Sequence, residues 1–259
     1  MTAPVDYDQL MRALETATPE ARLQIIQKYL KSISDPQQRK FVETLLLTGQ
    51  EIGRREEAKH IVVCLHGIRT RAPWQERLRS ELRVVAPHLE VVPMGYGDYP
   101  LVRFLALRGS RTEVVEHIRS QLVALFEQNT DAQISLIAHS FGSYIISEIL
   151  KSETQIQFHR LLLCGSIVSE RFPWQQMKPK FVSGAIANDV GIRDLWPLIA
   201  SKLGLGYGPS GRYGFKNVAV ADNFHDCGHS GFFNPEHYIK FWVPFLSDGQ
   251  VVDSGLVRE

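Results

Sequence analysis

Ala138-His139-Ser140-Phe141-Gly142 is the stretch of sequence that decides the fold. It follows an apolar run at residues 134–137 and precedes residues 143–150, whose apolar positions recur at helical spacing. The pattern small-x-Ser-x-Gly is required where a strand turns sharply into a helix, because only small residues fit two positions before and after the serine. The sequence therefore predicts a turn that presents the Ser140 hydroxyl at the end of a strand.

Further features stand where such a turn requires them. Residues 61–65 are typical of a buried strand and end in His66-Gly67-Ile68-Arg69, a glycine-containing loop that can aim a backbone N–H at a developing oxyanion. Downstream of the serine, an acidic residue and then a histidine lie at the ends of later strand patterns. The order is therefore serine, acid, histidine.

This order and its setting resemble the serine α/β-hydrolases, over roughly residues 60 to 246. The residues that carry the resemblance are His66-Gly67, Ala138-His139-Ser140-Phe141-Gly142, Asp194-Leu195-Trp196-Pro197 and Gly228-His229-Ser230. Ala138 stands where glycine is commoner, which is a mild steric change. The resemblance implies an α/β-hydrolase fold and the activity of an esterase or lipase-like enzyme.

Alternating strand and helix patterns from residue 60 onward predict a mostly parallel sheet of about six strands with helices on both faces. Strands are expected at residues 61–65, 89–92, 134–137, 161–164, 181–187 and 218–221. Helices are expected at residues 74–85, 112–127, 143–150 and 235–245, the last capped by Asn234.

Residues 1–58 have a different pattern. Their apolar positions recur at helical spacing, and Thr18-Pro19 and Asp35-Pro36 are typical helix starts. We expect an N-terminal helical extension over residues 1–58, packed on an α/β-hydrolase domain over residues 59–259. The alternative is that these helices dock a protein partner or a membrane surface.

Composition narrows the range of partners. A net charge of +1 with 22% charged residues gives no basic field for nucleic acid. No uninterrupted apolar run approaches the length of a membrane span, and the first residues do not have the pattern of a signal peptide. Three widely spaced cysteines argue against a disulfide framework. We therefore expect a soluble cytoplasmic protein without a transmembrane segment.

Three residues are the candidates for catalysis. Ser140 is the expected nucleophile, and its alternative role is to cap the following helix. His229 is the expected base, because histidines of the resembled family often follow a glycine and begin the loop that feeds the last helix; His225 competes with it. Asp194 is expected to orient the histidine, since the family acid is often followed closely by a proline, and Asp189 is the alternative.

The resemblance implies an oxyanion hole made by the backbone N–H groups of Ile68 and Phe141. Arg69 could hold a carboxylate or phosphate of the substrate. Trp174 belongs to a group of aromatic residues that could line an acyl or alcohol pocket.

No cofactor or metal is implied, because the cluster His225-Asp226-Cys227-His229 matches no common zinc spacing. The leading interpretation is hydrolysis of a small carboxylic ester or thioester through an acyl-enzyme on Ser140. Two alternatives stay open. One is an acyltransferase that uses the same residues, and the other is a non-catalytic interaction protein built on a hydrolase scaffold.

Overall fold

The computed structural model describes the residue ranges 28–31, 39–40, 59–67, 73–95, 108–152, 156–202 and 206–256, and the single residues 25, 33 and 36. Contacts divide the chain into two units, Met1–Ala58 and Lys59–Glu259. In the first unit, Tyr29 and Ile33 form a small buried cluster. Most of the helices expected over residues 1–58 lie outside the described residues, so these helices and their role remain predictions.

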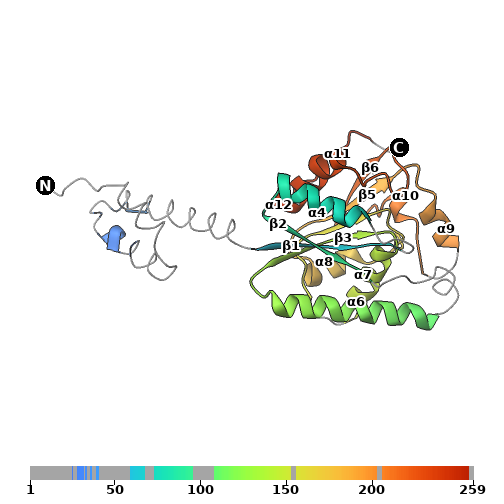
Figure 1. Cartoon of the computed structure of the whole chain (residues 1–259), viewed down its shortest axis with the longest axis horizontal. Coiled ribbons are helices and arrows are strands. Elements are labelled where there is room, and N and C mark those ends of the chain that lie inside the picture. Colours follow the sequence, from blue (N-terminus) through green and yellow to red (C-terminus); the bar gives the residue numbers. More distant parts are fainter. Residues whose placement is uncertain are drawn as a thin grey trace. The chain divides into compact units, whose positions relative to one another are not determined.

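The second unit is built on a six-stranded sheet in which every pair of neighbouring strands is parallel (Figure 1). The strand order is β2-β1-β3-β4-β5-β6. The strands are β1 (His60–Leu65), β2 (Leu89–Met94), β3 (Gln133–His139), β4 (Leu161–Cys164), β5 (Ile186–Gly191) and β6 (Ala221–His225).

Helices cover both faces of the sheet (Figure 1). One face is covered by α6 (Arg108–Gln128), α7 (Phe141–Lys151) and α8 (Trp174–Phe181). The other is covered by α4 (Pro73–Val85), α11 (Pro235–His237), the π-helix η1 (Tyr238–Trp242) and α12 (Val243–Asp248). The short helices α9 (Trp196–Lys202) and α10 (Ser210–Tyr213) connect β5 to β6. The predicted fold class, an α/β-hydrolase fold, is confirmed.

Strand β1 explains why the sheet has two apolar cores. Ile61, Val63 and Leu65 face α6 and α7, whereas Val62 and Cys64 face α4. All five side chains are almost completely buried. Burial of one such side chain stabilises the fold by about 2 kcal/mol relative to exposure, which is why a strand covered on both faces is apolar throughout.

The sheet has a topological switch between β1 and β3. The chain leaves β1 toward β2 on one side, and later continues from β3 toward β4 on the other. Leu65 pairs with Ala138 in the β1–β3 register, so the loop after β1 begins beside the turn after β3. Ligands of open parallel sheets bind at the carboxyl ends of the strands at such a point.

The structure corrects two predicted strands. Residue 181 ends helix α8, and the strand expected at 181–187 runs instead over Ile186–Gly191. The strand expected at 218–221 is shifted to Ala221–His225. The last predicted helix consists of α11, η1 and α12, and its cap is confirmed because Asn234 Oδ1 accepts the backbone N–H of His237 at 2.9 Å.

The segment 251–256 lies along β6, at one end of the strand order. Asn223 donates a side-chain N–H to the carbonyl of Val252 at 3.0 Å and accepts the backbone N–H of Ser254 at 3.2 Å. The Ser254 hydroxyl also donates to the carbonyl of Phe224. This segment, which sequence analysis alone would leave as a loose end, is therefore bonded to the last strand.

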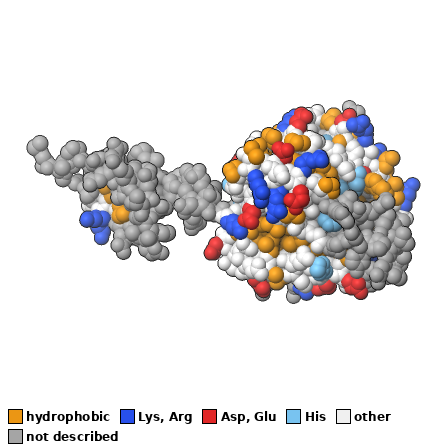
Figure 2. All heavy atoms as spheres, in the orientation of Figure 1, with side chains coloured by type: hydrophobic (Ala, Val, Ile, Leu, Met, Phe, Trp, Pro, Cys, Tyr) orange, Lys and Arg blue, Asp and Glu red, His pale blue; other side chains and the backbone are white. Residues whose placement is uncertain are grey.

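Basic and acidic side chains are interspersed on the described surface of the second unit that Figure 2 presents. None of the described helices combines the length and the apolar character that spanning a membrane would need.

Candidate active site

Ser140 sits on a strained turn between β3 and α7. Its backbone has φ 54° and ψ −119°, a conformation that a residue with a Cβ rarely adopts. The Ser140 N–H donates to the carbonyl of Cys164 at 3.1 Å, and the Ser143 hydroxyl donates to the Ser140 carbonyl at 2.5 Å. A Cβ on Gly142 would lie 2.6 Å from the Leu65 carbonyl oxygen, so only glycine fits two residues after the serine.

Three side chains form one hydrogen-bonded chain at this turn. The Ser140 hydroxyl donates to His229 Nε2 at 2.9 Å, and His229 Nδ1–H donates to Asp194 Oδ2 at 2.7 Å. Because a carboxylate can only accept, the proton of a neutral His229 must be on Nδ1, which leaves Nε2 free to accept from the serine. Asp194 is fully buried, and the His229 side chain is 18% exposed. The structure thus brings together the three residues expected to be catalytic.

The two loops that carry the acid and the histidine are held to each other by backbone bonds. After β5, the N–H of Ile192 donates to the carbonyl of His225, and that of Arg193 donates to the carbonyl of Cys227. The Arg193 guanidinium also pairs with Asp226 at 2.8 Å. These contacts fix the acid loop against the histidine loop, and they therefore hold the side chains of Asp194 and His229 at a set distance.

Two glycines approach the site closely. A Cβ on Gly67 would lie 2.8 Å from Ser140 Cβ and 3.5 Å from the backbone nitrogen of Phe141. A Cβ on Gly165, which has φ +52°, would lie 3.0 Å from His229 Nδ1. The loop at Gly67 could be predicted from the sequence, whereas Gly165 could not, because its only signal is a glycine directly after a strand.

His139 holds the backbone of the candidate base, His229, through a hydrogen bond. Its Nε2–H donates to the His229 carbonyl at 2.9 Å, and its ring contacts Trp74 and Phe233, which stack on each other. Burial, together with the neighbouring His229, lowers the pKa of His139 to about 3. His139 is therefore neutral at physiological pH and adds no positive charge beside an imidazole that must itself become charged.

One of the two expected oxyanion donors, the backbone N–H of Phe141, belongs to the described residues. Phe141 is the first residue of α7, directly after the serine, and Gly67 packs against its backbone. Ile68 and Arg69 lie outside the described residues. The oxyanion role of both backbone N–H groups and the substrate role of Arg69 stay predictions.

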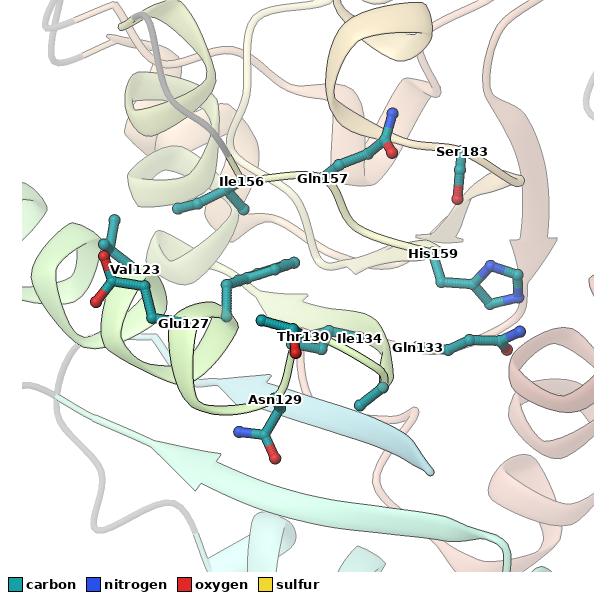
Figure 3. Close-up of a pocket in the computed structure, with 12 residues that line it drawn as sticks. Val123, Glu127, Asn129, Thr130, Gln133, Ile134, Ile156, Gln157, His159 and Ser183 are labelled. Carbon is teal, nitrogen blue, oxygen red and sulfur yellow. The ribbon is translucent and has the colours of Figure 1, made fainter. Parts of the chain in front are cut away.

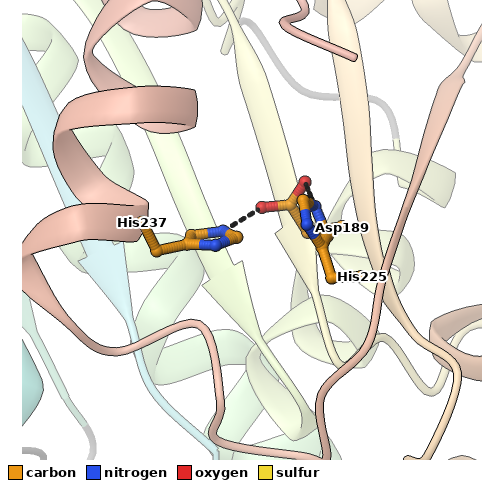
Figure 4. Close-up of side chains that lie close together, drawn as sticks. All are labelled: Asp189, His225 and His237. Atoms are coloured by element: carbon orange, nitrogen blue, oxygen red, sulfur yellow. Dashed lines mark hydrogen bonds and ion pairs between the residues drawn. The ribbon is translucent and has the colours of Figure 1, made fainter. Parts of the chain in front are cut away.

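The alternative acid and base, Asp189 and His225, are bonded to each other (Figure 4). Asp189 Oδ1 accepts His225 Nε2–H at 3.0 Å, and Oδ2 accepts His237 Nε2–H at 2.8 Å and Trp242 Nε1–H at 2.7 Å. Burial by itself would raise the pKa of Asp189, but the hydrogen bonds from both imidazoles lower it to about 2. Asp194 rather than Asp189 therefore contacts the histidine that faces Ser140.

The π-helix η1 explains how two of these donors reach one oxygen. His237 and Trp242 are five positions apart, and a regular α-helix would separate their directions by about 140°. The i→i+5 bonding of a π-helix places such residues nearly above each other. Both side chains consequently point at Asp189 Oδ2.

Asp189, His225 and His237 also have the donor types of a metal site. In the described part of the chain, however, each imidazole is directed at a different oxygen of the same carboxylate (Figure 4). Ligands of one metal ion must instead converge on a single point. The arrangement therefore fits a buried carboxylate that is satisfied by N–H donors better than it fits a metal centre.

Two tryptophans differ sharply in their exposure. Trp174, expected in a substrate pocket, is fully buried and packs on Phe172 and Phe215, which leaves it no contact with a substrate. Trp196 is instead half exposed, and its ring centre lies 6.2 Å from that of His229. Its backbone N–H donates to Asp194 Oδ1 at 3.0 Å.

An open hollow of about 450 Å³ lies elsewhere on the described surface (Figure 3). It is formed by the end of α6, the start of β3 and residues 156–159. Gln133 lines it at the amino end of β3, whereas Ser140 follows the carboxyl end of the same strand, roughly 20 Å away. The hollow is therefore not part of the candidate active site.

No protein-family model matches the sequence, and no curated protein matches it. Among solved structures, an uncharacterized protein from Bacillus cereus ATCC 10987 is similar with a TM-score of 0.52 and 11% identity, over 93% of this chain and 85% of that one. A predicted CIB-like hydrolase from Thermoplasma acidophilum has a TM-score of 0.49 and 13% identity, over 74% and 88%. An alpha-beta serine hydrolase homologue from Coxiella burnetii has a TM-score of 0.46 and 13% identity, over 75% and 86%. Identities this low bear on the fold alone.

Proposed function

We propose that the chain is a serine hydrolase that cleaves carboxylic esters or thioesters through an acyl-enzyme on Ser140. The observation that carries the proposal is the unbroken hydrogen-bonded chain from the Ser140 hydroxyl through His229 to the buried Asp194. A serine that merely caps a helix has no need of an oriented imidazole, and α7 has no side-chain cap bond from Ser140. The strained backbone of Ser140 supports the same function.

The hydrogen-bonded chain of Ser140, His229 and Asp194 supports the following reaction. Ser140 Oγ attacks the carbonyl carbon while its proton passes to His229 Nε2, and Asp194 stabilises the resulting imidazolium. The N–H of Phe141 and that of Ile68 stabilise the oxyanion. The bond to the leaving alcohol or thiol then breaks, and His229 donates the proton to the leaving atom. Water attacks the acyl-enzyme, gives a proton to His229, and releases the acid with Ser140 restored.

A fluorophosphonate probe tests the proposal, because such probes label only an activated serine. We expect the full chain to be labelled and to hydrolyse p-nitrophenyl esters, and Ser140→Ala to lose both properties while keeping its thermal unfolding transition. Ser80→Ala, which removes an exposed hydroxyl from α4, is the matched control and should be labelled normally. Labelling that persists in Ser140→Ala would refute the assignment.

We also propose that the protein works in a reducing compartment such as the cytoplasm. Cys64, Cys164 and Cys227, the three cysteines of the chain, are all free thiols. Cell fractionation with an antibody against the chain tests this; recovery only from an oxidising compartment would contradict it.

A further inference from the structure

Helix α9 begins two residues after Asp194, and its first side chain lies beside the candidate base. The backbone of Trp196 is fixed by its bond to Asp194 Oδ1, so the indole starts from a defined position. Its ring is inclined at 46° to the His229 ring, with centres 6.2 Å apart. The position of this indole is therefore tied to the same carboxylate that orients the histidine.

Trp196 is also the exposed tryptophan of this protein. The other three, Trp74, Trp174 and Trp242, are 6% exposed or less, whereas Trp196 is 49% exposed. Leu195 is 59% exposed and Ile199 is 50% exposed. Residues 196 and 199 are three positions apart on a helix and so share a face. Together with Leu195, which directly precedes Trp196 in the chain, they form an exposed apolar strip.

The proton transfer from His229 to the leaving group indicates which part of a substrate would contact this strip. In the proposed reaction, His229 Nε2 donates its proton to the leaving oxygen or sulfur, which must come within about 3 Å of that nitrogen. The rest of the leaving group then extends past the imidazole. In that reaction the carbonyl oxygen of the substrate lies toward the backbone N–H of Phe141, against which Gly67 packs, so the acyl group extends away from the imidazole.

We propose that Trp196, with Leu195 and Ile199 beyond it, binds the leaving group of the substrate, and that the preferred substrates are esters or thioesters of apolar or aromatic alcohols or thiols. This inference rests on the proposed hydrolase function. Trp196 acts here as a specificity residue, since its contact is with the departing group. An indole suits this role because it offers a large rigid apolar surface.

Two ester series on the full chain test the proposal. In the first, the acyl group stays acetyl and the alcohol grows from methyl to butyl, hexyl and benzyl; in the second, the alcohol stays methyl and the acyl chain grows. We expect Trp196→Ala to lower the kcat/KM ratio of benzyl to methyl acetate about tenfold, as loss of a large apolar contact does. Trp196→Phe should keep most of the preference, and Ile199→Ala should affect only the longer alcohols. Val84→Ala, which removes an exposed apolar side chain from α4, is the control.

The step that is affected gives a second readout. Once the alcohol has left, the acetyl-enzyme no longer contacts the strip, so Trp196→Ala should slow acylation by hexyl or benzyl esters and not hydrolysis of the acetyl-enzyme. An unchanged benzyl-to-methyl ratio overturns the proposal. A change of preference along the acyl series in Trp196→Ala also overturns it. So does a Trp196→Ala variant that keeps its ester preference and loses only its binding to phosphatidylcholine vesicles, measured by co-sedimentation. If the wild-type chain is neither labelled by a fluorophosphonate nor active on any ester, the proposed function itself fails, which is a distinct result.

Discussion

The backbone of Gly165 lies against the imidazole of His229, so that a Cβ at this position would come within 3.0 Å of Nδ1 and 3.2 Å of Cε1. The same glycine has a φ of +52° and follows β4 directly. The space for the His229 imidazole thus depends on the residue that follows β4, although β4 contributes no catalytic side chain.

Gly165→Ala should therefore lower activity more than stability. The positive φ costs about 1 kcal/mol for alanine, and the new methyl group must displace the imidazole by several tenths of an ångström. We expect kcat/KM to fall at least tenfold with a small decrease in the unfolding temperature. Gly206→Ala is the control, because Gly206 has φ +85° with no atom within 4 Å of the added Cβ. Equal activity losses in the two variants would show that the contact with His229 is unimportant.

The two buried aspartates should separate activity from stability. Asp194→Asn should lower kcat by about 10⁴-fold, because an amide no longer fixes the tautomer of His229. Asp189→Asn should leave kcat per folded molecule within about threefold. The far-UV circular dichroism signal gives the concentration of folded enzyme for both variants, independently of whether Ser140 is activated. The reverse result, with activity lost only in Asp189→Asn, would assign the triad acid to Asp189.

Stability should be affected more by Asp189→Asn than by Asp194→Asn, which is the reverse of the order expected for activity. The carboxylate accepts three buried N–H groups, whereas an amide has one acceptor oxygen and directs its own N–H groups at the remaining donors. Each buried N–H left unpaired costs about 1–3 kcal/mol. Urea unfolding at neutral pH should show this loss of free energy in Asp189→Asn, while Asp194→Asn should lose less. An unchanged urea midpoint in Asp189→Asn would contradict the role of the network.

Buried histidines should make the protein sensitive to mild acid. The pKa of His139 and that of His60 are both lowered to about 3, chiefly by burial. Unfolding restores a pKa near 6.5, so the unfolded chain binds protons that the native one does not. The stabilisation is complete above pH 6.5 and is lost as the pH falls from about 6.5 toward 3.

Urea unfolding between pH 6 and pH 4 measures this dependence. Each such histidine contributes a slope approaching 1.4 kcal/mol per pH unit. His139→Gln should reduce the slope by about that amount, and His60→Asn should do the same. His117→Gln on α6, whose exposed imidazole bonds to Gln121, serves as the control and should leave the slope unchanged. An identical slope in all variants would show that neither buried histidine stays neutral in the native state.

The elements whose buried side chains are all apolar could be predicted from the sequence. Residues 161–164 of β4 were predicted without error, because a short apolar run covered on both faces has a clear pattern. The turn at Ser140 was predictable because its steric demands fall on neighbouring residues in the chain. Such local demands leave a direct trace in the sequence.

The strands β5 and β6 could not be placed correctly because polar residues run through their interiors. Asn188 and Asp189 are typical of loops, yet they lie in β5, where Asn188 bonds to Ser210 and Asp222 and Asp189 bonds to His225. Their partners come from distant segments, so no local pattern predicts them. The same shift hid the fact that Asp189 points into the core while Asp194 lies in the loop beyond.

The roles of Gly165 and Trp196 were also beyond local patterns. Each depends on the distance to His229, which the fold determines and the sequence spacing does not. Trp196 could be recognised from the sequence as a neighbour of Asp194, but its exposure could not.

The segment bonded along β6 has a consequence for how this protein behaves in concentrated solution. An uncovered last strand offers its free N–H and C=O groups as a template on which another molecule can add a strand. Here the Ser254 hydroxyl occupies the backbone carbonyl of Phe224, and the side-chain amide of Asn223 holds Val252 and Ser254 alongside the strand. In a chain that ends before Val251, this edge of β6 would be uncovered. Such a chain should self-associate and precipitate at concentrations at which the longer chain stays in solution.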